Sequence, residues 1–190
     1  MKYVASVQMG QSFRTRLDVV MSGGVAVIQM KDLTDQNRVS CAELVRIDIE
    51  KPKAHHLMKR NDLVFRSRGL VTNSAIVDDD PGDAVLAAPL FRIRLTESRI
   101  MPEYLNWFIS QAPAQSFLAS HAKGTAQKMI SKDVLEDLEV LVPPLERQRK
   151  IIEMAALVEE EQKLMRKLAE KRKQYIFRTL MQMAEGEPNR

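Results

Sequence analysis

The segment Val142-Pro143-Pro144-Leu145 opens a stretch of about 40 residues in which neither Gly nor Pro recurs before Gly186. Proline fixes φ and lacks a backbone N–H group, so this pair ends the preceding element and suits the first turn of a helix. The residues that follow are mostly Leu, Met, Ala, Glu, Lys, Arg and Gln, all of which favour helix. At about 1.5 Å per residue this helix is about 60 Å long, which exceeds the width of a small domain.

Apolar side chains recur along this predicted helix at close to the heptad interval of a coiled coil. The recurring positions are Ile151, Met154/Ala155, Val158, Met165, Leu168, Tyr175/Ile176, Thr179 and Met183. An apolar stripe on a helix longer than its own domain has to be covered by another helix. Residues 144–184 are therefore predicted to be a helical spacer and residues 185–190 a flexible tail. The residues predicted to contact a partner helix are Ile151, Ala155, Val158, Met165, Leu168 and Tyr175.

Charged residues interrupt this stripe at Glu161/Gln162 and at Lys171/Arg172. If two copies pair their helices antiparallel, the acidic interruption of one helix faces the basic interruption of the other, and such charges fix the register of a coiled coil. The alternative is an exposed charged face, with Glu159 and Lys163 paired at positions i and i+4.

Composition sets the outer limits. The chain has 190 residues, of which 45% are hydrophobic and 28% charged, so it has room for one globular domain and an appendage. We expect a cytoplasmic protein without a membrane span, because the sequence lacks a long apolar run and residues 1–6 lack the apolar core of a signal peptide. The single cysteine, Cys41, excludes an internal disulfide and a Cys-based zinc site, and it is expected to be buried in a strand-like run.

The net charge of +4 does not by itself indicate nucleic-acid binding. Residues 1–143 carry 18 basic and 17 acidic side chains, and the remaining residues carry 11 and 8. Local clustering is more informative, since Lys51 to Arg68 holds six basic residues and His55-His56 against the single acid Asp62. Acidic residues gather instead in Asp78–Asp83, which is predicted to be a hairpin-like loop. The basic cluster is either a DNA-binding patch or a solvated face.

The pattern of residues 1–143 predicts an α+β domain that is mostly β. Short apolar or alternating runs predict strands at residues 4–7, 25–30, 45–49, 63–65, 75–77, 84–95 and 138–142. A 3.6-residue period predicts a helix from Pro102 until Pro113 ends it, and a second short helix at residues 114–122. Ser131 is a candidate N-cap for one more helical turn.

The search for catalytic motifs is negative. The sequence has no Gly-rich nucleotide-binding motif, no GxSxG and no HExxH, and it lacks the Asn/Asp-Pro-Pro-aromatic motif of amino-methyltransferases. It has no Pro-Asp dipeptide to begin a restriction-type nuclease site, and its three histidines lack metal-ligand spacing. We therefore expect neither an enzyme nor a bound metal or cofactor.

Several polar loops combine Arg or Lys with Gln, Asn, Ser or Thr. Such side chains suit phosphate contacts, and they also match guanine or adenine edges in the major groove. The residues that we predict to bind DNA are Gln11, Ser12, Arg14, Lys31, Asn37, Arg38, Arg66, Arg68, Lys123, Thr125, Gln127 and Lys128. Solvated turns are the alternative for each loop taken alone, and the sequence does not reveal whether the loops converge.

Five segments occur in the order found in a known family. They are Gly24–Leu33 (GVAVIQMKDL), Lys59–Gly69 (KRNDLVFRSRG), Pro102–Phe108 (PEYLNWF), Gly124–Ile130 (GTAQKMI) and Leu141–Ile151 (LVPPLERQRKI). Together they resemble one half of the specificity subunit of type I restriction-modification systems. The resemblance implies that residues 1–143 are a DNA target-recognition domain and that the long helix is one of the helical spacers of the family.

The chain also departs from this family. A usual specificity subunit has two recognition domains and two spacers, and this chain has one of each. Lys59-Arg60-Asn61-Asp62 stands where a Lys-Gly-Asp turn is usual, and Arg147 stands where an acidic residue is common.

The resemblance implies a non-catalytic reader of double-stranded DNA that docks methyltransferase subunits and, through them, a restriction subunit that is a nuclease and translocase. The methyl donor and ATP then belong to the partners. A homodimer through antiparallel C-terminal helices rebuilds the two-domain arrangement and reads two half-sites. The alternative is an interaction module whose degenerate recognition domain does not read DNA.

Overall fold

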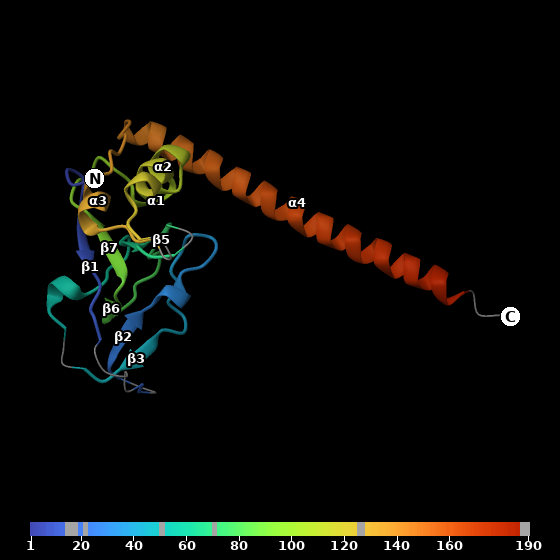
Figure 1. Ribbon diagram of the computed structural model, residues 1–190, viewed down its shortest axis with the longest axis horizontal. Coiled ribbons are helices and arrows are strands. Elements are labelled where there is room, and N and C mark those ends of the chain that lie inside the picture. Colours follow the sequence, from blue (N-terminus) through green and yellow to red (C-terminus); the bar gives the residue numbers. More distant parts are fainter. Residues whose placement is uncertain (14–18, 21–22, 50–51, 70–71, 125–127, 187–190) are drawn as a thin grey trace. The chain divides into compact units, whose positions relative to one another are not determined.

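The computed structural model describes residues 1–13, 19–20, 23–49, 52–69, 72–124 and 128–186. They form two compact units, Met1–Gln148 and Arg149–Arg190. The first unit contains two β-sheets and three short helices, and the second consists of helix (Figure 1).

The larger sheet has four antiparallel strands in the order β1-β7-β4-β5. Their bounds are Ala5–Met9 for β1, Leu90–Leu95 for β7, Leu63–Arg66 for β4 and Ser74–Ile76 for β5. Branched and aromatic side chains dominate the two inner strands, which suits a half-buried pleated surface. The strands predicted at residues 4–7, 63–65 and 75–77 are thus confirmed within two residues.

The smaller sheet has three strands in the order β3-β2-β6. β2 (Val25–Ile28) pairs antiparallel with β3 (Val45–Ile47) and parallel with β6 (Ala84–Leu86). The single strand predicted at residues 84–95 is wrong, since β6 and β7 lie in different sheets. Pro89, which lacks an N–H group, interrupts the run, and the N–H of Leu90 instead closes a turn onto the carbonyl of Ala87 at 3.1 Å.

The acidic segment Asp78–Asp83 connects β5 of the larger sheet to β6 of the smaller one. The prediction of a hairpin-like loop is therefore wrong, because the flanking strands do not pair. Gly82 has a φ of 61°, and its N–H donates to a side-chain oxygen of Asp80 at 3.0 Å. The segment is a crossover between the sheets.

The hydrophobic core joins side chains of both sheets. Ile28 and Leu86 of the smaller sheet belong to the same buried cluster as Val64, Ala75 and Leu90 of the larger one. Burying one such aliphatic side chain contributes about 1.5–3 kcal/mol, so this contact holds the sheets together. Cys41 packs against the cluster half-buried, in a loop and not in the strand-like run that we expected. Burial raises the pKa of its thiol.

Three short helices accompany the larger sheet. α1 (Pro102–Ile109) contacts β5, α3 (Lys132–Asp137) contacts β1, and α2 (Ala112–His121) contacts both of these helices. Ser131 caps α3 as predicted, because its hydroxyl accepts the N–H of Val134 at 3.4 Å. Pro113 does not end the first helix; it lies in the first turn of α2, where its missing N–H costs nothing.

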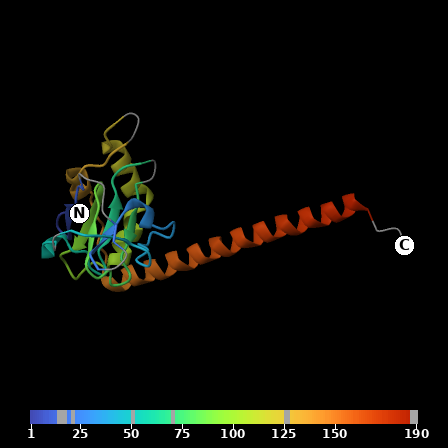
Figure 2. The ribbon, with the colours of Figure 1, turned by 90° about the horizontal axis from the view of Figure 1, so that it is seen from below.

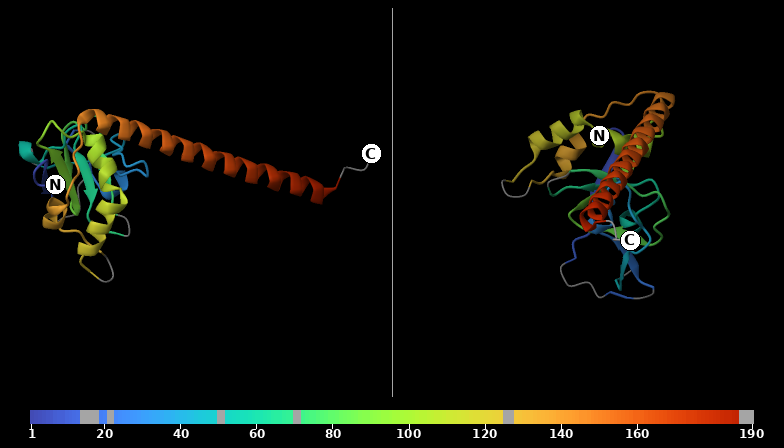
Figure 3. Two further views of the ribbon diagram at one scale, coloured as in Figure 1. Left: turned by 90° about the horizontal axis from the view of Figure 1, so that it is seen from above. Right: turned by 90° about the vertical axis from the view of Figure 1, so that its right-hand side faces the viewer.

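The strand predicted at residues 138–142 does not form. Two carbonyl groups of this segment accept hydrogen bonds from donors that do not belong to a strand. The amino terminus of Met1 donates to the carbonyl of Leu138, and the hydroxyl of Tyr104 donates to the carbonyl of Leu141 at 2.8 Å. The chain start nonetheless meets this part of the fold, since the N–H of Lys2 donates to the carbonyl of Glu136 in α3 at 3.0 Å (Figure 3).

The long helix α4 spans Leu145–Glu185, so the helix predicted from residue 144 begins one residue later than expected. It is uninterrupted over its 41 residues (Figure 2). Its first turn belongs to the unit Met1–Gln148, where the side chain of Gln148 is fully buried.

Candidate nucleic-acid interface

The ends of several strands meet at one place in the unit Met1–Gln148. The N–H of Gly10, directly after β1, donates to Leu90 at the start of β7 at 2.8 Å. The N–H of Gln11 donates to Leu86 at the end of β6 at 2.6 Å, and Leu90 is opposite Arg66 at the end of β4. A Cβ atom at Gly10 would lie 2.6 Å from the carbonyl carbon of Ala87, so this approach requires glycine. The loops that follow β1 and β4 are thereby brought to the same end of the larger sheet.

The loop after β4 joins the basic loop before α3. The N–H of Ile130 donates to Ser67 at 2.8 Å, and that of Gly69 donates to Lys128 at 3.4 Å. Met129 bridges to Arg68 on one side and exchanges two backbone hydrogen bonds, of 3.0 and 2.8 Å, with Lys123 on the other. The structure therefore brings together two of the loops that the sequence analysis selected.

Arg68 and Lys123 flank Met129 in this small ladder. Residues directly opposite one another in a ladder project to the same face, and the side chain of Arg68 does lie against Met129, with Nε 3.2 Å from Sδ. Arg68, Lys123 and Lys128 are all exposed. We call Arg68 and Lys123 the basic pair. Two cations on one exposed face provide what a phosphate backbone requires.

Arg66 lies beside the turn that contains Lys31. Arg66 is half-buried, and its Nη2 is 3.5 Å from the carbonyl of Met30, at the start of the 3₁₀ turn η1 (Met30–Asp32) that contains the exposed Lys31. The strand predicted to run to Met30 ends at Ile28 because this turn begins. Arg66 therefore connects the end of β4 to the turn after β2.

Asn37 and Arg38 serve the fold. Asn37 has a φ of 56°, its side-chain oxygen accepts from Asn73 at 2.8 Å, and its carbonyl accepts from Asn106 at 3.1 Å. The exposed Arg38 forms an ion pair with Asp78. No contact in the described residues joins these two to the basic pair.

Gln11 and Ser12 follow β1. The amide of Gln11 is bonded to Nδ1 of His56 at 2.6 Å, while Ser12 is exposed. Burial lowers the pKa of His56, and the positive charges of His55, Lys53 and Arg92 add to this effect. Three further residues predicted to bind DNA, Arg14, Thr125 and Gln127, lie outside the described residues.

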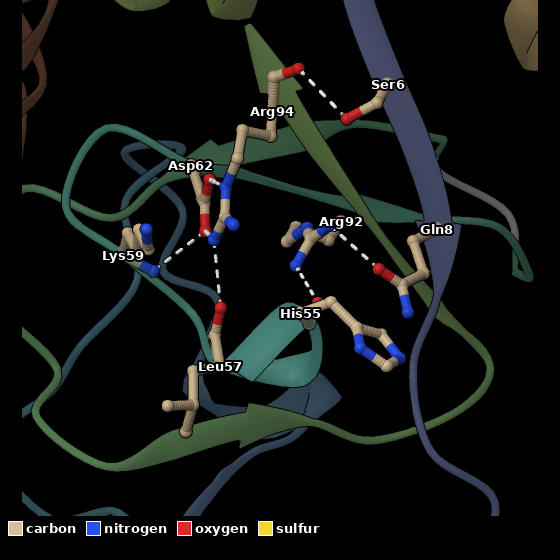
Figure 4. Close-up of polar contacts among 8 residues, drawn as sticks. All are labelled: Ser6, Gln8, His55, Leu57, Lys59, Asp62, Arg92 and Arg94. Atoms are coloured by element: carbon tan, nitrogen blue, oxygen red, sulfur yellow. Dashed lines mark hydrogen bonds and ion pairs between the residues drawn. The ribbon is translucent and has the colours of Figure 1, made fainter. Parts of the chain in front are cut away.

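Among the described residues of the basic cluster, Lys59 and Arg60 precede β4, whereas Arg66 and Arg68 lie at its other end. Asp62, directly before β4, accepts hydrogen bonds from Nε and Nη2 of Arg94 at 2.7 and 2.6 Å (Figure 4). Its carboxylate also accepts a hydrogen bond from the backbone N–H of Lys59 at 2.7 Å. This bidentate hydrogen bonding raises the pKa of Arg94. Arg66 follows at the other end of the strand. The sequence analysis did not foresee this ion pair, because 32 residues separate its two members.

Arg92 lies two residues before Arg94 on β7 and also acts inside the fold. Its guanidinium donates to the carbonyl of His55 at 2.6 Å and to the side chain of Gln8 at 2.8 Å (Figure 4). Burial lowers the pKa of Arg92. Arg92 and Arg94 thus fix the segment around residues 55–62 to the larger sheet.

The apolar stripe of α4 is exposed. Leu168 and Tyr175 expose 69% and 72% of their surface, Val158 and Met165 are exposed as well, and only the earlier Ile151 and Ala155 are half-buried. The ion pair expected between Glu159 and Lys163 is not the one observed, since Lys163 binds Glu160 at 3.2 Å.

Two features are absent from the described residues. Nowhere in this part of the chain do three or more His, Cys, Asp or Glu side chains gather as metal ligands would. None of its helices is both long enough and apolar enough to cross a membrane.

The described residues thus form two packed sheets with joined basic loops and a long helix with an exposed apolar stripe. The family model for the type I restriction modification DNA specificity domain matches residues 2–171, and the chain belongs to this family. The family predicted from the five sequence segments is thus confirmed. No curated protein sequence matches the chain.

Solved structures give the same fold. A chain from a structure that concerns complex assembly and conformational transition of the type I R-M system matches with a TM-score of 0.69 and 16% sequence identity. The HsdS subunit from Thermoanaerobacter tengcongensis matches with a TM-score of 0.65 and 20% sequence identity. The type I restriction-modification S subunit from M. genitalium matches with a TM-score of 0.57 and 13% sequence identity. The predicted α+β fold with one long C-terminal helix is confirmed.

The matches differ greatly in how much of each protein they cover. They include 93%, 87% and 91% of this chain, but 41%, 43% and 41% of those chains. The chain therefore spans less than half the length of each.

Proposed function

We propose that this chain is a non-catalytic specificity subunit that reads one half-site of a DNA target for a type I restriction-modification complex. Residues 1–143 act as the target-recognition domain and residues 144–184 as the spacer, with residues 185–190 as a tail. The observation that carries this proposal is the joining of two basic loops around Met129, which gives the family fold an exposed pair of cations.

The spacer assembles the complex. Two copies pair through antiparallel C-terminal helices, and the pair docks methyltransferase subunits and, through them, the restriction subunit. The exposed side chains of Leu168 and Tyr175 support a covered helix in the assembly, because large apolar side chains in a row are costly to leave in water. The methyl donor and ATP are supplied by the partner subunits.

A test removes the basic pair. In the complex assembled with its methyltransferase subunits, Arg68→Gln with Lys123→Gln should weaken binding to duplex DNA and leave assembly intact. The charge-matched control is Lys2→Gln with Arg99→Gln. Lys2 precedes β1 and Arg99 follows β7, at the end of the larger sheet away from the basic pair, so this control should leave DNA binding unchanged. Equal affinity of the two double variants would reject the proposed reading surface.

One observation favours a second function, that of an interaction module which assembles partners without reading DNA. The side chains of Gln11, Asn37 and Arg38, all predicted to bind DNA, already bind other side chains of this chain. Replacing Arg66 and Arg68 together separates the two functions, since lost DNA binding with intact assembly favours the reader. If the unmodified complex assembles but does not bind DNA, that result favours the interaction module.

A further inference from the structure

Two charged residues lie within the apolar stripe of α4. We assign Ile151 to position a of the heptad. Every seventh residue from Ile151 to Thr179 is then an a position, and every seventh residue from Met154 to Gln182 is a d position. Glu161 is at a d position and Arg172 at an a position, so both lie on the side that a partner helix covers.

Glu161 and Arg172 are exposed, and within the part of the chain that the structure describes neither forms an ion pair. They are eleven positions apart, which is about 16 Å along a helix and too far for a contact between them. A charge partner for either residue would have to come from another helix.

A parallel pair of two copies makes poor contacts at these positions. Parallel helices place each a residue opposite its own copy and each d residue likewise. Glu161 would then face Glu161 of the second copy, and Arg172 would face Arg172. Like charges across an interface are strongly unfavourable, so the sequence disfavours the parallel pair.

An antiparallel pair removes both conflicts in one register. Antiparallel helices place an a residue of one copy opposite a d residue of the other, so Glu161 can face Arg172 of the second copy. The two-fold axis then passes between residues 166 and 167. The same register places Met165 opposite Leu168 and Val158 opposite Tyr175.

The neighbouring registers are worse. A shift of one heptad in one direction places Glu161 opposite Met165 of the second copy, and a shift in the other places it opposite Thr179. Either shift leaves four charges unpaired across the dimer. A covered ion pair adds little stability, because desolvation offsets its attraction, but an unpaired covered charge is costly. The charges therefore select the register.

We propose that two copies of this chain pair along α4 in this single antiparallel register, with Glu161 of each copy opposite Arg172 of the other. This deepens the homodimer of the proposed function and rests on it. The occupant of the stripe is thus a second copy, and its recognition signal is charge complementarity at these two positions.

Disulfide trapping tests the register in the full-length chain. In a Cys41→Ser background, Val158→Cys and Tyr175→Cys are made in separate proteins, one of which carries a mass tag, and the two are refolded together and oxidised. The mixture should give a cross-linked heterodimer. Neither variant should cross-link to itself, because its two copies are 17 positions apart, about 25 Å along the pair. The mixture of Val158→Cys with Leu168→Cys reports the register shifted by one heptad.

Charge exchange gives a second measurement. Glu161→Lys and Arg172→Glu each create two like-charge contacts, so each should weaken self-association, measured by analytical ultracentrifugation, by about tenfold or more. The double variant should restore it, and so should a mixture of the two single variants. The matched controls Glu159→Lys and Arg166→Glu, on the outer side of the helix, should have little effect.

The outcomes separate the inference from the proposed function. Cross-linking of Val158→Cys to itself, or only of the shifted pair, would overturn the antiparallel register while leaving a DNA reader intact. A strict monomer at high concentration would overturn both the register and the homodimer. Failure of the exchanged charges to restore association would overturn the role of Glu161 and Arg172.

Discussion

Gln148 in the first turn of α4 binds Met101 across the end of the larger sheet: the N–H of Met101 donates to Oε1 of Gln148 at 2.8 Å. The other end of the same amide, Nε2, donates to the carbonyls of Arg99 at 2.8 Å and Pro143 at 2.7 Å. One fully buried side chain thus satisfies three backbone groups from two segments. These bonds hold the start of α4 to the rest of the unit Met1–Gln148.

We expect Gln148→Leu to destabilise the recognition domain by about 3 kcal/mol, because a buried polar group left without a partner costs about 1–3 kcal/mol. The single tryptophan, Trp107 in α1, reports urea unfolding of this unit by fluorescence. Gln174→Leu, at an exposed position of α4, is the control. An unfolding midpoint equal to that of the control would show that the three bonds contribute nothing.

Asp62 and Asp78 provide a matched comparison of two ion pairs. Asp62 is 2% exposed and holds Arg94, whereas Asp78 holds the exposed Arg38. Asp62→Asn should lower the free energy of unfolding by about 3 kcal/mol, because it leaves the partly buried guanidinium of Arg94 without its charge partner. Asp78→Asn should cost less than about 1 kcal/mol, because surface pairs contribute little. Similar losses in urea unfolding would contradict the role assigned to Asp62.

His56 makes the stability of the fold depend on pH. Because burial lowers its pKa below the ordinary 6.5, the unfolded chain takes up a proton before the folded one does. Stability should therefore be greatest above pH 6.5 and fall as the pH drops through this range. A ¹H NMR titration of the imidazole should give a pKa below 6.5, and His56→Asn should reduce the pH dependence. A titration at or above the ordinary value would disprove the effect of burial.

The salt dependence of DNA binding reports how many phosphates the basic pair contacts. Each lost phosphate contact lowers the slope of log affinity against log salt by about 1. In the assembled complex, Arg68→Gln with Lys123→Gln should therefore lower the slope by about 2 across all duplexes. A slope unchanged from that of the unmodified complex would mean that neither side chain contacts a phosphate.

Local patterns in the sequence were sufficient for most elements of the fold. The long helix, the strands around Val64 and Ala75 and the cap at Ser131 follow from periodicity and capping chemistry, which are local properties. Several expectations failed where tertiary structure decided, two of them in apolar runs. Pro89 divided an apparently continuous apolar run between two sheets, and the run after Leu138 found side-chain donors instead of a strand.

The candidate site was harder to predict because it depends on long-range contacts. The sequence showed which loops are polar, but it did not distinguish Arg68, which lies against Met129 beside the second basic loop, from Arg38, which binds Asp78. Gln148 was missed, because a glutamine among charged helix residues gives no sign that it is buried. The charges at Glu161 and Arg172, on which the proposed register rests, were visible in the sequence, since a heptad break is a local pattern.

Selection from a pool of randomised duplexes by the complex assembled with its methyltransferase subunits tests the central claim most directly. If two copies related by a two-fold axis each read a half-site, sequencing of the bound DNA should reveal one palindromic motif with a central gap of constant length. The same selection with the Arg68→Gln and Lys123→Gln variant should recover that motif more weakly. A complex that binds DNA yet enriches no motif at all would contradict the account.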